Sequence, residues 1–341
     1  MMQLTIRDIT DNEQWDAFVT AHAEANFLHA WQWGVFHESR GATVVRRGAF
    51  YNDTLLGVYE GVVEDAKRGR HLSIAGGPIV NWETHTVVEA LRDDMKQQAK
   101  QHKCVFVRVR PQLEKSDASL ALFKQLGFRP APMYLSVELA GVLDLTKDED
   151  EIMKGMRQRL RRALRKAAKN NIEVETSTDP ARMKEFYDIQ LQTAGRQKFV
   201  AFSEDFFTKQ FKAFAETGNA VLYTARYNGE VLAQNFMIFY GNEASYHYGV
   251  STELGTKLSG APLLHMQAMR DARERGITRY NFWGIVDEDD TEHRFYGVSV
   301  FKRGFGVDEL RYVPAHDLVI RPLAYKITWF IETVRRKARK V

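Results

Sequence analysis

The order of predicted elements occurs twice along the chain, once in each half. Each half predicts a helix, a hairpin of strands, a helix, a buried strand and a further helix. The clearest hairpins are residues 44–63, around Tyr51-Asn52-Asp53-Thr54, and residues 220–240, around Asn228-Gly229, both of which have good turn residues between strand-like runs. We therefore expect a structural repeat of the α+β class, without obvious sequence identity between its halves.

The repeat predicts two domains, and 341 residues are enough for each to bury its own core. We expect the first domain to contain residues 1–143 plus 317–341 and the second to contain residues 144–316. The closing residues 318–340 predict a helix with an apolar face that includes Trp329, Phe330 and Ile331. This helix is expected to return to the first domain.

Cysteine content and apolar runs restrict the compartment. Cys104 is the single cysteine, so no intrachain disulfide can form, and its place in an apolar run predicts a small core residue. No secretory leader and no run near the roughly 18 apolar residues of a membrane span is present. We expect a cytoplasmic protein.

The net charge is only +4, but positive residues gather at Lys154–Lys169 and Arg335–Lys340. The second cluster follows an aromatic segment, so it could lie on an anionic membrane or on nucleic acid. A solvated chain end is the commoner meaning of such a run.

Six stretches share residues with one enzyme family. They are Phe27–Gly34 with its Trp33-Gly34 ending, the basic segment Arg157–Lys169, Thr193–Phe199, Ala244–Ser251, Tyr280–Ile285 and Phe301–Gly306. On these residues, which span nearly the whole chain, the sequence resembles the FemABX family, whose members build the interpeptide branches of bacterial cell walls.

The resemblance implies two acetyltransferase-like (GNAT-type) domains with mixed sheets, the first completed by the C-terminal helix. Some members carry a long coiled-coil arm in the second domain. Between Val174 and Ala220 the sequence predicts only two ordinary helices, so we expect no arm.

The implied activity is transfer of an amino acid from aminoacyl-tRNA to an amine of a UDP-linked or lipid-linked muropeptide precursor. No cofactor is implied, because the donor ester is already activated. A lipid-linked acceptor would bring the enzyme to the inner face of the membrane. We expect a monomer.

The catalytic residues that the resemblance implies are Lys302, Phe301 and Tyr248. Lys302 matches the family's active-site lysine, whose ammonium could hold the terminal ribose or phosphate and stabilise the developing oxyanion. Without the neighbouring Gly304-Phe305-Gly306 motif, Lys302 would be interpreted as a surface lysine at a helix end.

The implied substrate-binding residues include Arg196 and Thr193, from a Thr-x-x-Arg motif that grips precursor phosphates. The alternative for Arg196 is an ion pair with Glu204 or Asp205. Tyr246 and Tyr248 alternate on a strand, so we expect both rings on one face, along the substrate channel. Trp33, in the N-terminal motif, completes this group.

Two further positions depart from the family pattern. His37 stands where many members have a phosphate-binding lysine, so phosphate binding there would weaken near neutral pH. Arg110 stands where members often have an acidic residue at the end of a central strand. Arg110 is either an additional phosphate contact or a sign of a different substrate.

The basic segment is predicted to be part of one helix from Asp148 to Lys169. Its cationic side chains could bind the tRNA backbone or form a solvated face, and the two interpretations stand about even. These side chains are Arg157, Arg161, Arg162, Arg165, Lys166 and Lys169.

Two rival functions remain open. An acyl-CoA-dependent N-acyltransferase of the same fold would need a glycine-rich turn for pyrophosphate, and the nearest stretch, Lys257–Pro262, is degenerate because Pro262 removes an amide donor. A nucleic-acid-binding protein would leave the Phe301-Lys302 motif without explanation. We expect no metal, and interpret Asp287–His293 as a solvated loop.

Overall fold

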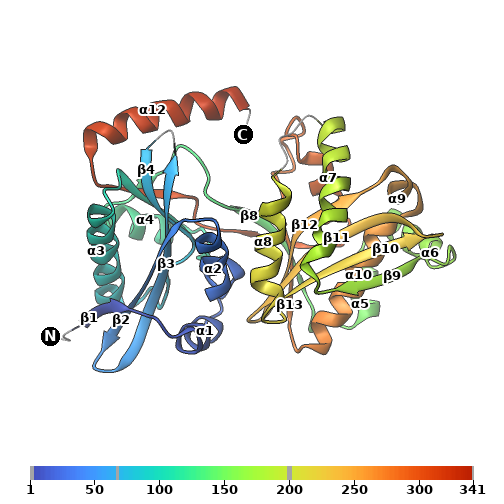
Figure 1. Ribbon diagram of the computed structural model, residues 1–341, viewed down its shortest axis with the longest axis horizontal. Helices are drawn as coiled ribbons and strands as arrows, with labels where there is room; N and C mark the ends of the chain where they lie inside the picture. The colour runs from blue at the N-terminus through green and yellow to red at the C-terminus, as the bar shows by residue number, and fades with distance from the viewer. Residues whose placement is uncertain (1–3, 67–68, 198–201, 340–341) are drawn as a thin grey trace. The chain divides into compact units, whose positions relative to one another are not determined.

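The computed structural model describes residues 4–66, 69–197 and 202–339. These residues form two compact units (Figure 1). Unit 1 consists of Met1–Leu139, Thr291–His293 and Leu310–Val341, and unit 2 of Ala140–Asp290 and Arg294–Glu309. Each unit has its own mixed sheet with helices, which confirms the predicted fold class.

The sheet of unit 1 has the order β1-β2-β3-β4-β6-β15-β7, and β5 pairs with β3. Its neighbours are antiparallel except β4 and β6, which run parallel. The strands are β1 (Leu4–Asp8), β2 (Thr43–Tyr51), β3 (Thr54–Ala66), β4 (Gly69–Gly76), β5 (Ile79–Val80), β6 (Phe106–Pro111), β7 (Arg129–Pro130) and β15 (His316–Val319).

One face of this sheet packs against α3 and α4, whose apolar side chains form a core with the inward residues of the strands. Leu91 and Met95 of α3 and Phe123 of α4 are almost completely buried in it. Cys104 is buried there too, as its apolar run predicted. The helices of unit 1 are α1 (Asn12–Thr20), the 3₁₀ helix η1 (Phe27–His29), α2 (Trp31–Ser39), α3 (His85–Gln101), α4 (Asp117–Gln125) and α12 (Pro322–Arg339).

The C-terminal residues return to unit 1, as predicted, but they begin with a strand. β15 pairs with β6 and precedes α12, so the helix predicted over residues 318–340 starts at Pro322. Buried Arg108 of β6 holds both elements, because its guanidinium donates to Asp317 of β15 at 2.7 Å and to Glu332 of α12 at 2.7 Å. The last helix is therefore part of the first unit.

The sheet of unit 2 has the order β14-β8-β13-β12-β11-β10-β9. The pair β12 and β13 is parallel, as β4 and β6 are in unit 1. Both parallel pairs are joined through a long helix, α10 in unit 2 and α3 in unit 1, so the predicted repeat is present. The strands are β8 (Leu139–Asp144), β9 (Glu173–Ser177), β10 (Ala220–Tyr227), β11 (Glu230–Tyr240), β12 (Glu243–Ser251), β13 (Arg279–Gly284) and β14 (Asp308–Arg311).

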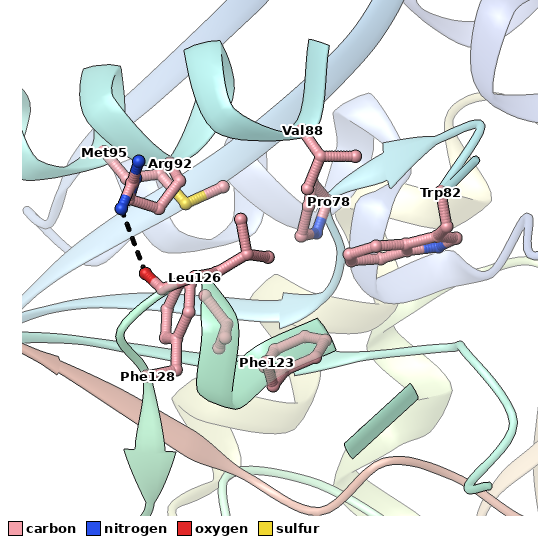
Figure 2. A pocket seen from close by; sticks show the side chains of 9 residues that line it. Pro78, Trp82, Val88, Arg92, Met95, Phe123, Leu126 and Phe128 are labelled. Atoms are coloured by element: carbon pink, nitrogen blue, oxygen red, sulfur yellow. Dashed lines mark hydrogen bonds between the residues drawn. The ribbon is translucent and has the colours of Figure 1, made fainter. Parts of the chain in front are cut away.

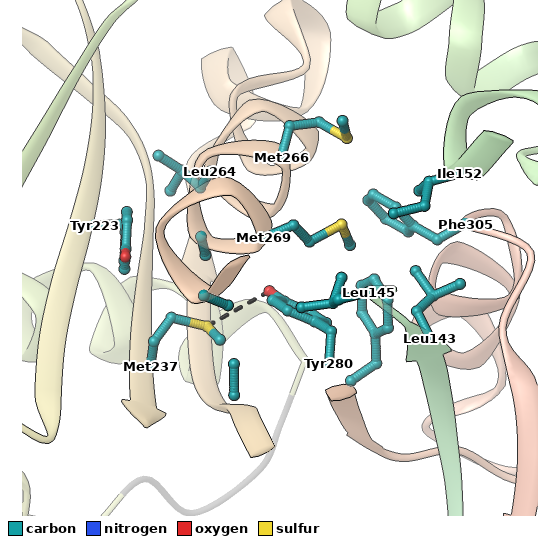
Figure 3. Close-up of a cluster of buried hydrophobic side chains, with 14 of the residues drawn as sticks. Leu143, Leu145, Ile152, Tyr223, Met237, Leu264, Met266, Met269, Tyr280 and Phe305 are labelled. Atoms are coloured by element: carbon teal, nitrogen blue, oxygen red, sulfur yellow. Dashed lines mark hydrogen bonds between the residues drawn. The ribbon is translucent and has the colours of Figure 1, made fainter. Parts of the chain in front are cut away.

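The core of unit 2 lies between its sheet and α10, with side chains from α5 and α6 (Figure 3). Leu264 and Met269 of α10 pack there with Tyr280 of β13. The opposite face carries α7 and α8, where Phe211 of α8 packs on Phe236 of β11 with ring centroids 5.0 Å apart. The helices are α5 (Glu149–Gly155), α6 (Gln158–Ala167), the 3₁₀ helix η2 (Pro180–Arg182), α7 (Met183–Gln197), α8 (Glu204–Ala215), α9 (Glu253–Leu258), α10 (Gly260–Glu274) and α11 (Tyr296–Arg303).

Within the described residues, the segment between β9 and β10 contains η2, α7 and α8 and no coiled-coil arm, as predicted. The predicted boundary after residue 143 falls inside β8, which pairs with β13 of unit 2. The predicted boundary before residue 317 falls inside β15, which pairs with β6 of unit 1.

The long helix predicted from Asp148 to Lys169 is wrong, because the chain leaves the helical conformation at Met156 and Arg157. Backbone groups at this break find hydrogen-bond partners elsewhere. The Arg157 amide donates to the Gly304 carbonyl at 2.8 Å. The Arg161 guanidinium donates to the carbonyls of Lys154 and Met156. The basic helix is therefore α6 alone, with the neighbouring residues at its two ends.

Candidate active site

The two parallel strands of unit 2 part before they end. Their ladder runs from Glu243 opposite Arg279 to Ser245 opposite Asn281, after which β12 and β13 continue without pairing to each other. In unit 1 the ladder of β4 and β6 extends to Gly76 opposite Pro111, at the end of both strands. The opened strand pair in unit 2 is therefore the candidate place for a substrate to bind.

Lys302 lies at this opening. It is in the last turn of α11 and only 7% exposed. Its Nζ donates to the Gly284 carbonyl, at the end of β13, at 2.7 Å. It also lies 5.6 Å from the centroid of the Tyr246 ring of β12. The predicted alternative, a surface lysine at a helix end, is therefore wrong about its exposure.

Burial lowers the pKa of the Lys302 ammonium to about 7, because the low-polarity surroundings disfavour the charge. Protonated and neutral amine are then present in comparable amounts at neutral pH. Burial, with a smaller contribution from the nearby charge of Lys302, also lowers the pKa of His265 to about 3. The imidazole of His265 is therefore neutral, and its Nδ1 lies 2.7 Å from the Tyr280 hydroxyl.

A strained turn holds the carbonyl that Lys302 contacts. Trp283 has a φ of 65°, in the left-handed region that a bulky side chain rarely adopts. The buried Asn281 side chain accepts a hydrogen bond from the Trp283 amide at 2.7 Å, which stabilises this conformation. The turn thereby directs the Gly284 carbonyl toward Nζ of Lys302.

The end of α11 is braced on the far side of the lysine. Arg303, also nearly buried, donates to Glu309 at 2.6 Å and to the Val286 carbonyl at 2.6 Å. Phe301 packs against His265 and Phe305, with ring centroids 5.6 and 5.4 Å apart. Phe301 thus supports the helix end that carries Lys302.

The prediction that Tyr246 and Tyr248 share one face of the sheet is wrong. A β-bulge places Tyr248 opposite Phe236 and Tyr246 opposite Met237, so one extra residue lies between neighbouring pairs and reverses the alternation. Tyr246 packs against His265 of α10, whereas Tyr248 packs against Phe207 of α8. Only Tyr246 faces Lys302.

Two candidates in unit 1 lie on α2. Trp33 packs against the rings of Phe27 and Phe36. His37 is 9% exposed, and burial lowers its pKa to about 4, so it is neutral near pH 7. A neutral imidazole has no positive charge to attract phosphate, and weak phosphate binding at His37 stays a prediction.

Arg110 is completely buried in unit 1. Its guanidinium donates to the side chains of Ser136 and Gln112 and to the Pro111 carbonyl, and it lies over the Tyr312 ring. These contacts give Arg110 a structural role in this conformation. A phosphate would reach it only after these groups had moved.

Two further predictions concern Thr193 and Arg196. Both belong to the last turns of α7, and their side chains lie outside the described residues.

The six cationic residues of the basic segment differ in their surroundings. Arg161 is half-buried and bonded to backbone carbonyls at the helix break. The remaining five side chains are exposed and form a cationic surface on and around α6; they are Arg157, Arg162, Arg165, Lys166 and Lys169.

A separate small cavity in unit 1 is lined by apolar side chains, among them Trp82, Met95 and Phe123 (Figure 2). The one charged residue that lines it, Arg92, donates to the Leu126 carbonyl at 3.1 Å. This lining offers no pair of groups for acid–base chemistry. Among residues 4–66, 69–197 and 202–339, no group of three or more His, Cys, Asp or Glu could hold a metal ion.

Sequence reasoning assigned no role to His265, Asn281 or Trp283, although the last two lie in the Tyr280–Ile285 motif. The Asn281-x-Trp283 spacing was the available signal, because asparagine side chains commonly bond the backbone two residues ahead. His265 gave no signal, since its contact with Tyr246 depends on packing between α10 and β12.

Two family models match different parts of the chain. Residues 9–122 match the FemAB family, and residues 154–302 match an acetyltransferase (GNAT) domain. The first match covers most of unit 1, and the second covers unit 2 from Lys154 to Lys302.

The chain is also similar along its length to enzymes called lipid II:glycine glycyltransferase. The enzyme from Staphylococcus epidermidis is 22% identical over 403 residues, covering 96% of this chain and 95% of that protein. The enzyme from Staphylococcus aureus is 23% identical over 406 residues, covering 96% of each. Both alignments are longer than this chain of 341 residues, so those enzymes contain segments that it lacks.

Among solved structures, the crystal structure of FemX superposes with a TM-score of 0.86 at 21% identity, covering 96% of this chain and all of FemX. A tandem GNAT protein from the clavulanic acid biosynthesis pathway superposes with a TM-score of 0.59 at 14% identity, covering 93% of this chain and 99% of that one. These two likenesses show the fold, which is two acetyltransferase-like domains. The two matched models and the full-length relatives show that the chain belongs to the FemABX family.

Proposed function

We propose that this protein transfers an amino acid from aminoacyl-tRNA to an amine of a peptidoglycan precursor, in the synthesis of cell-wall interpeptide bridges. The observation that carries the proposal is the buried Lys302, bonded to the Gly284 carbonyl where β12 and β13 part. The names of the relatives support a muropeptide acceptor of the lipid-linked kind and glycine as the first donor to test.

The reaction joins the acceptor nitrogen to the ester carbon and breaks the bond between that carbon and the ribose oxygen. The acceptor amine must lose a proton, and the leaving ribose oxygen must gain one. The Lys302 ammonium can donate a hydrogen bond to the carbonyl oxygen as negative charge develops there. With a pKa near 7, the same group can also give its proton to the leaving ribose oxygen, and the neutral amine that remains can take the proton that the acceptor nitrogen loses.

The exposed cationic surface around α6 supports tRNA as the donor. The side chains of Arg162, Arg165 and Lys166 are exposed to solvent. Phosphates can therefore bind them without displacing another described residue. We place the donor's backbone on this surface. The proposal needs no cofactor, and it places a monomeric enzyme in the cytoplasm.

Acetyl-CoA is the alternative donor. The pyrophosphate of acetyl-CoA would bind at the start of α10. The glycines there are explained by close packing against Leu232, without any role in phosphate binding. A Cβ on Gly255 would collide with the Leu232 backbone, and one on Gly260 would lie 2.8 Å from the Leu232 side chain. Pro262, in the first turn of α10, has no amide to donate.

The test is label transfer from each aminoacyl-tRNA of a radioactive mixture, with acetyl-CoA assayed in parallel. UDP-linked and lipid-linked muropeptides are the two acceptors. We expect labelled muropeptide from one or a few aminoacyl-tRNAs and none from acetyl-CoA. Label from acetyl-CoA alone would replace the proposal with acyl-CoA-dependent transfer.

A further inference from the structure

Helix α12 carries an apolar stripe on its outer surface. Leu323, Ile327, Phe330 and Val334 are 79%, 65%, 65% and 50% exposed. Their spacing of four, three and four residues places them on one side of the helix. Large apolar side chains exposed together in this way mark a surface that binds something.

The stripe is not the side by which α12 packs on its own unit. That side consists of Tyr325, Thr328 and Glu332, which are each at most 2% exposed. Glu332 is bonded to Arg108, and the Tyr325 hydroxyl donates to Asp317 at 2.8 Å. The helix therefore has one side that packs on unit 1 through polar contacts and a second, apolar side that unit 1 does not cover.

Charge distinguishes the possible occupants of the outer face. Between residues 322 and 339, all of which have a described backbone, Glu332 is the only carboxylate, and it is buried on the inner side. The exposed Lys326 and Arg335 lie on the two sides of the stripe, and Trp329, which is 44% exposed, lies on the same side as Lys326. The outer surface of α12 thus combines apolar and aromatic side chains with positive charge alone.

This combination matches the interface of an anionic bilayer. Apolar side chains enter the acyl region, tryptophan prefers the headgroup boundary, and lysine and arginine bind lipid phosphates. A helix that lies in the interface does not need to span it. Consistently, no helix in the described parts of the chain is long and apolar enough to cross a membrane.

We propose that α12 docks the protein on an anionic lipid bilayer, with the helix axis along the surface and Leu323, Ile327, Phe330 and Val334 inserted. Lys326 and Arg335 then contact lipid phosphates on the two sides of the inserted stripe. Docking would bring the enzyme to an acceptor that is anchored in the same surface. It goes beyond the proposed reaction and does not depend on it.

The test is flotation of the purified full-length protein with vesicles of phosphatidylcholine, alone or with one third phosphatidylglycerol. The protein should float with the anionic vesicles and lose binding as salt rises, because screening weakens the cationic contacts. Ile327→Glu/Phe330→Glu should reduce the bound fraction at least tenfold. Val174→Glu, at an exposed aliphatic residue of β9, is the matched control and should bind normally.

A second readout uses no charge placed in the stripe. Trp329 fluorescence should shift to the blue on addition of anionic vesicles, and Trp329→Phe should abolish that shift without preventing flotation. Lys326→Glu/Arg335→Glu should weaken binding while leaving the apolar stripe intact. Thermal unfolding of each variant checks that unit 1 remains folded.

Unchanged flotation of Ile327→Glu/Phe330→Glu would overturn the proposal, as would equal binding to neutral and anionic vesicles. Absence of vesicle binding together with a dimer that the same double change disperses would assign the stripe to a second copy instead. Flotation is measured without tRNA or muropeptide. A negative result here therefore leaves the proposed reaction untouched, and an inactive enzyme that floats normally leaves the docking proposal untouched.

Discussion

At the scale of single residues, Lys302 shows a conflict between stability and function. An ammonium that is 7% exposed, with one carbonyl as its bonded partner, is costly to bury. Nothing in the packing of Phe301 or Tyr246 requires an amine there, since a methionine would fill a similar volume. A catalytic role would explain why a group that is costly to bury lies where two strands part.

This cost predicts the effect of Lys302→Met on stability. The pKa of Lys302 is about 7 when folded and 10.5 when unfolded, so between these values the unfolded chain binds more protons and stability rises with pH. The buried amine of the wild type therefore lowers the free energy of unfolding most at pH 7 and below. Methionine has no such term, so the variant should be more stable than wild type at pH 7, by up to a few kcal/mol.

The measurement is the free energy of unfolding by urea for both proteins at pH 7 and pH 10. The gain from Lys302→Met should shrink at the higher pH, where the folded wild type already has a neutral amine. Lys212→Met, at an exposed residue of α8, should give a difference that hardly varies with pH. A pH-independent difference for Lys302→Met would mean that the lysine is not buried as a titrating group.

At the scale of elements, the break between α5 and α6 separates two kinds of arginine. Arg161 bonds to the carbonyls left open at the break, whereas Arg162 and Arg165 extend into solvent. The sequence placed them on one continuous helix, since nothing in a run of helix-forming residues revealed that Arg157 bonds to Gly304, far along the chain.

Substitutions should distinguish the exposed arginines from the arginine that bonds to the helix break. Arg162→Glu/Arg165→Glu should weaken tRNA binding and make its dependence on salt less steep, with little change in melting temperature. Arg161→Ala should instead lower stability by about 1–2 kcal/mol, because it leaves carbonyls without their charged donor. Binding by filter retention over a salt series and thermal unfolding check the two results; identical behaviour of both variants would contradict the division.

The elements show what sequence patterns can and cannot predict. The hairpins, the order of elements in each half and the short α7–α8 segment followed from turn residues and apolar periodicity. The parallel pairing of β4 with β6 and of β12 with β13 was not predicted. The bulge in β12 was not predicted either, because it depends on how β11 pairs across from it, and it places Tyr246 and Tyr248 on opposite faces. Lys302 was found through its motif, but its burial and its contact with Gly284 needed the fold.

At the scale of the whole molecule, each acetyltransferase-like unit has its own core, and the chain returns to the first unit after completing the second. Arg108 holds the returning segment on unit 1, since it bonds to Asp317 and Glu332, more than 200 residues further along the chain. The sequence predicted the return from an apolar helix face, but Trp329, Phe330 and Ile331 of that face are exposed and other residues of α12 pack on unit 1. The sequence could not predict the buried ion pair, because nothing near Arg108 in the chain points to carboxylates more than 200 residues away.

Glu332→Ala should therefore destabilise unit 1 by about 2–4 kcal/mol, because it leaves part of the Arg108 guanidinium buried without its second carboxylate. Lys326→Ala, on the exposed side of α12, should change stability by less than about 0.5 kcal/mol. Urea unfolding with limited proteolysis of α12 measures both. Equal stability of the two variants would show that the ion pair does not hold the helix.

The central claim, that Lys302 acts in aminoacyl transfer, is tested most directly by single-turnover transfer from prebound aminoacyl-tRNA to muropeptide. Lys302→Met should lower the transfer rate at least a hundredfold while tRNA binding and folding persist, since it removes the donor to the developing oxyanion. Lys212→Met should transfer at the wild-type rate. Wild-type transfer by a folded Lys302→Met protein would contradict the claim and leave the parted strands of unit 2 without a catalytic group.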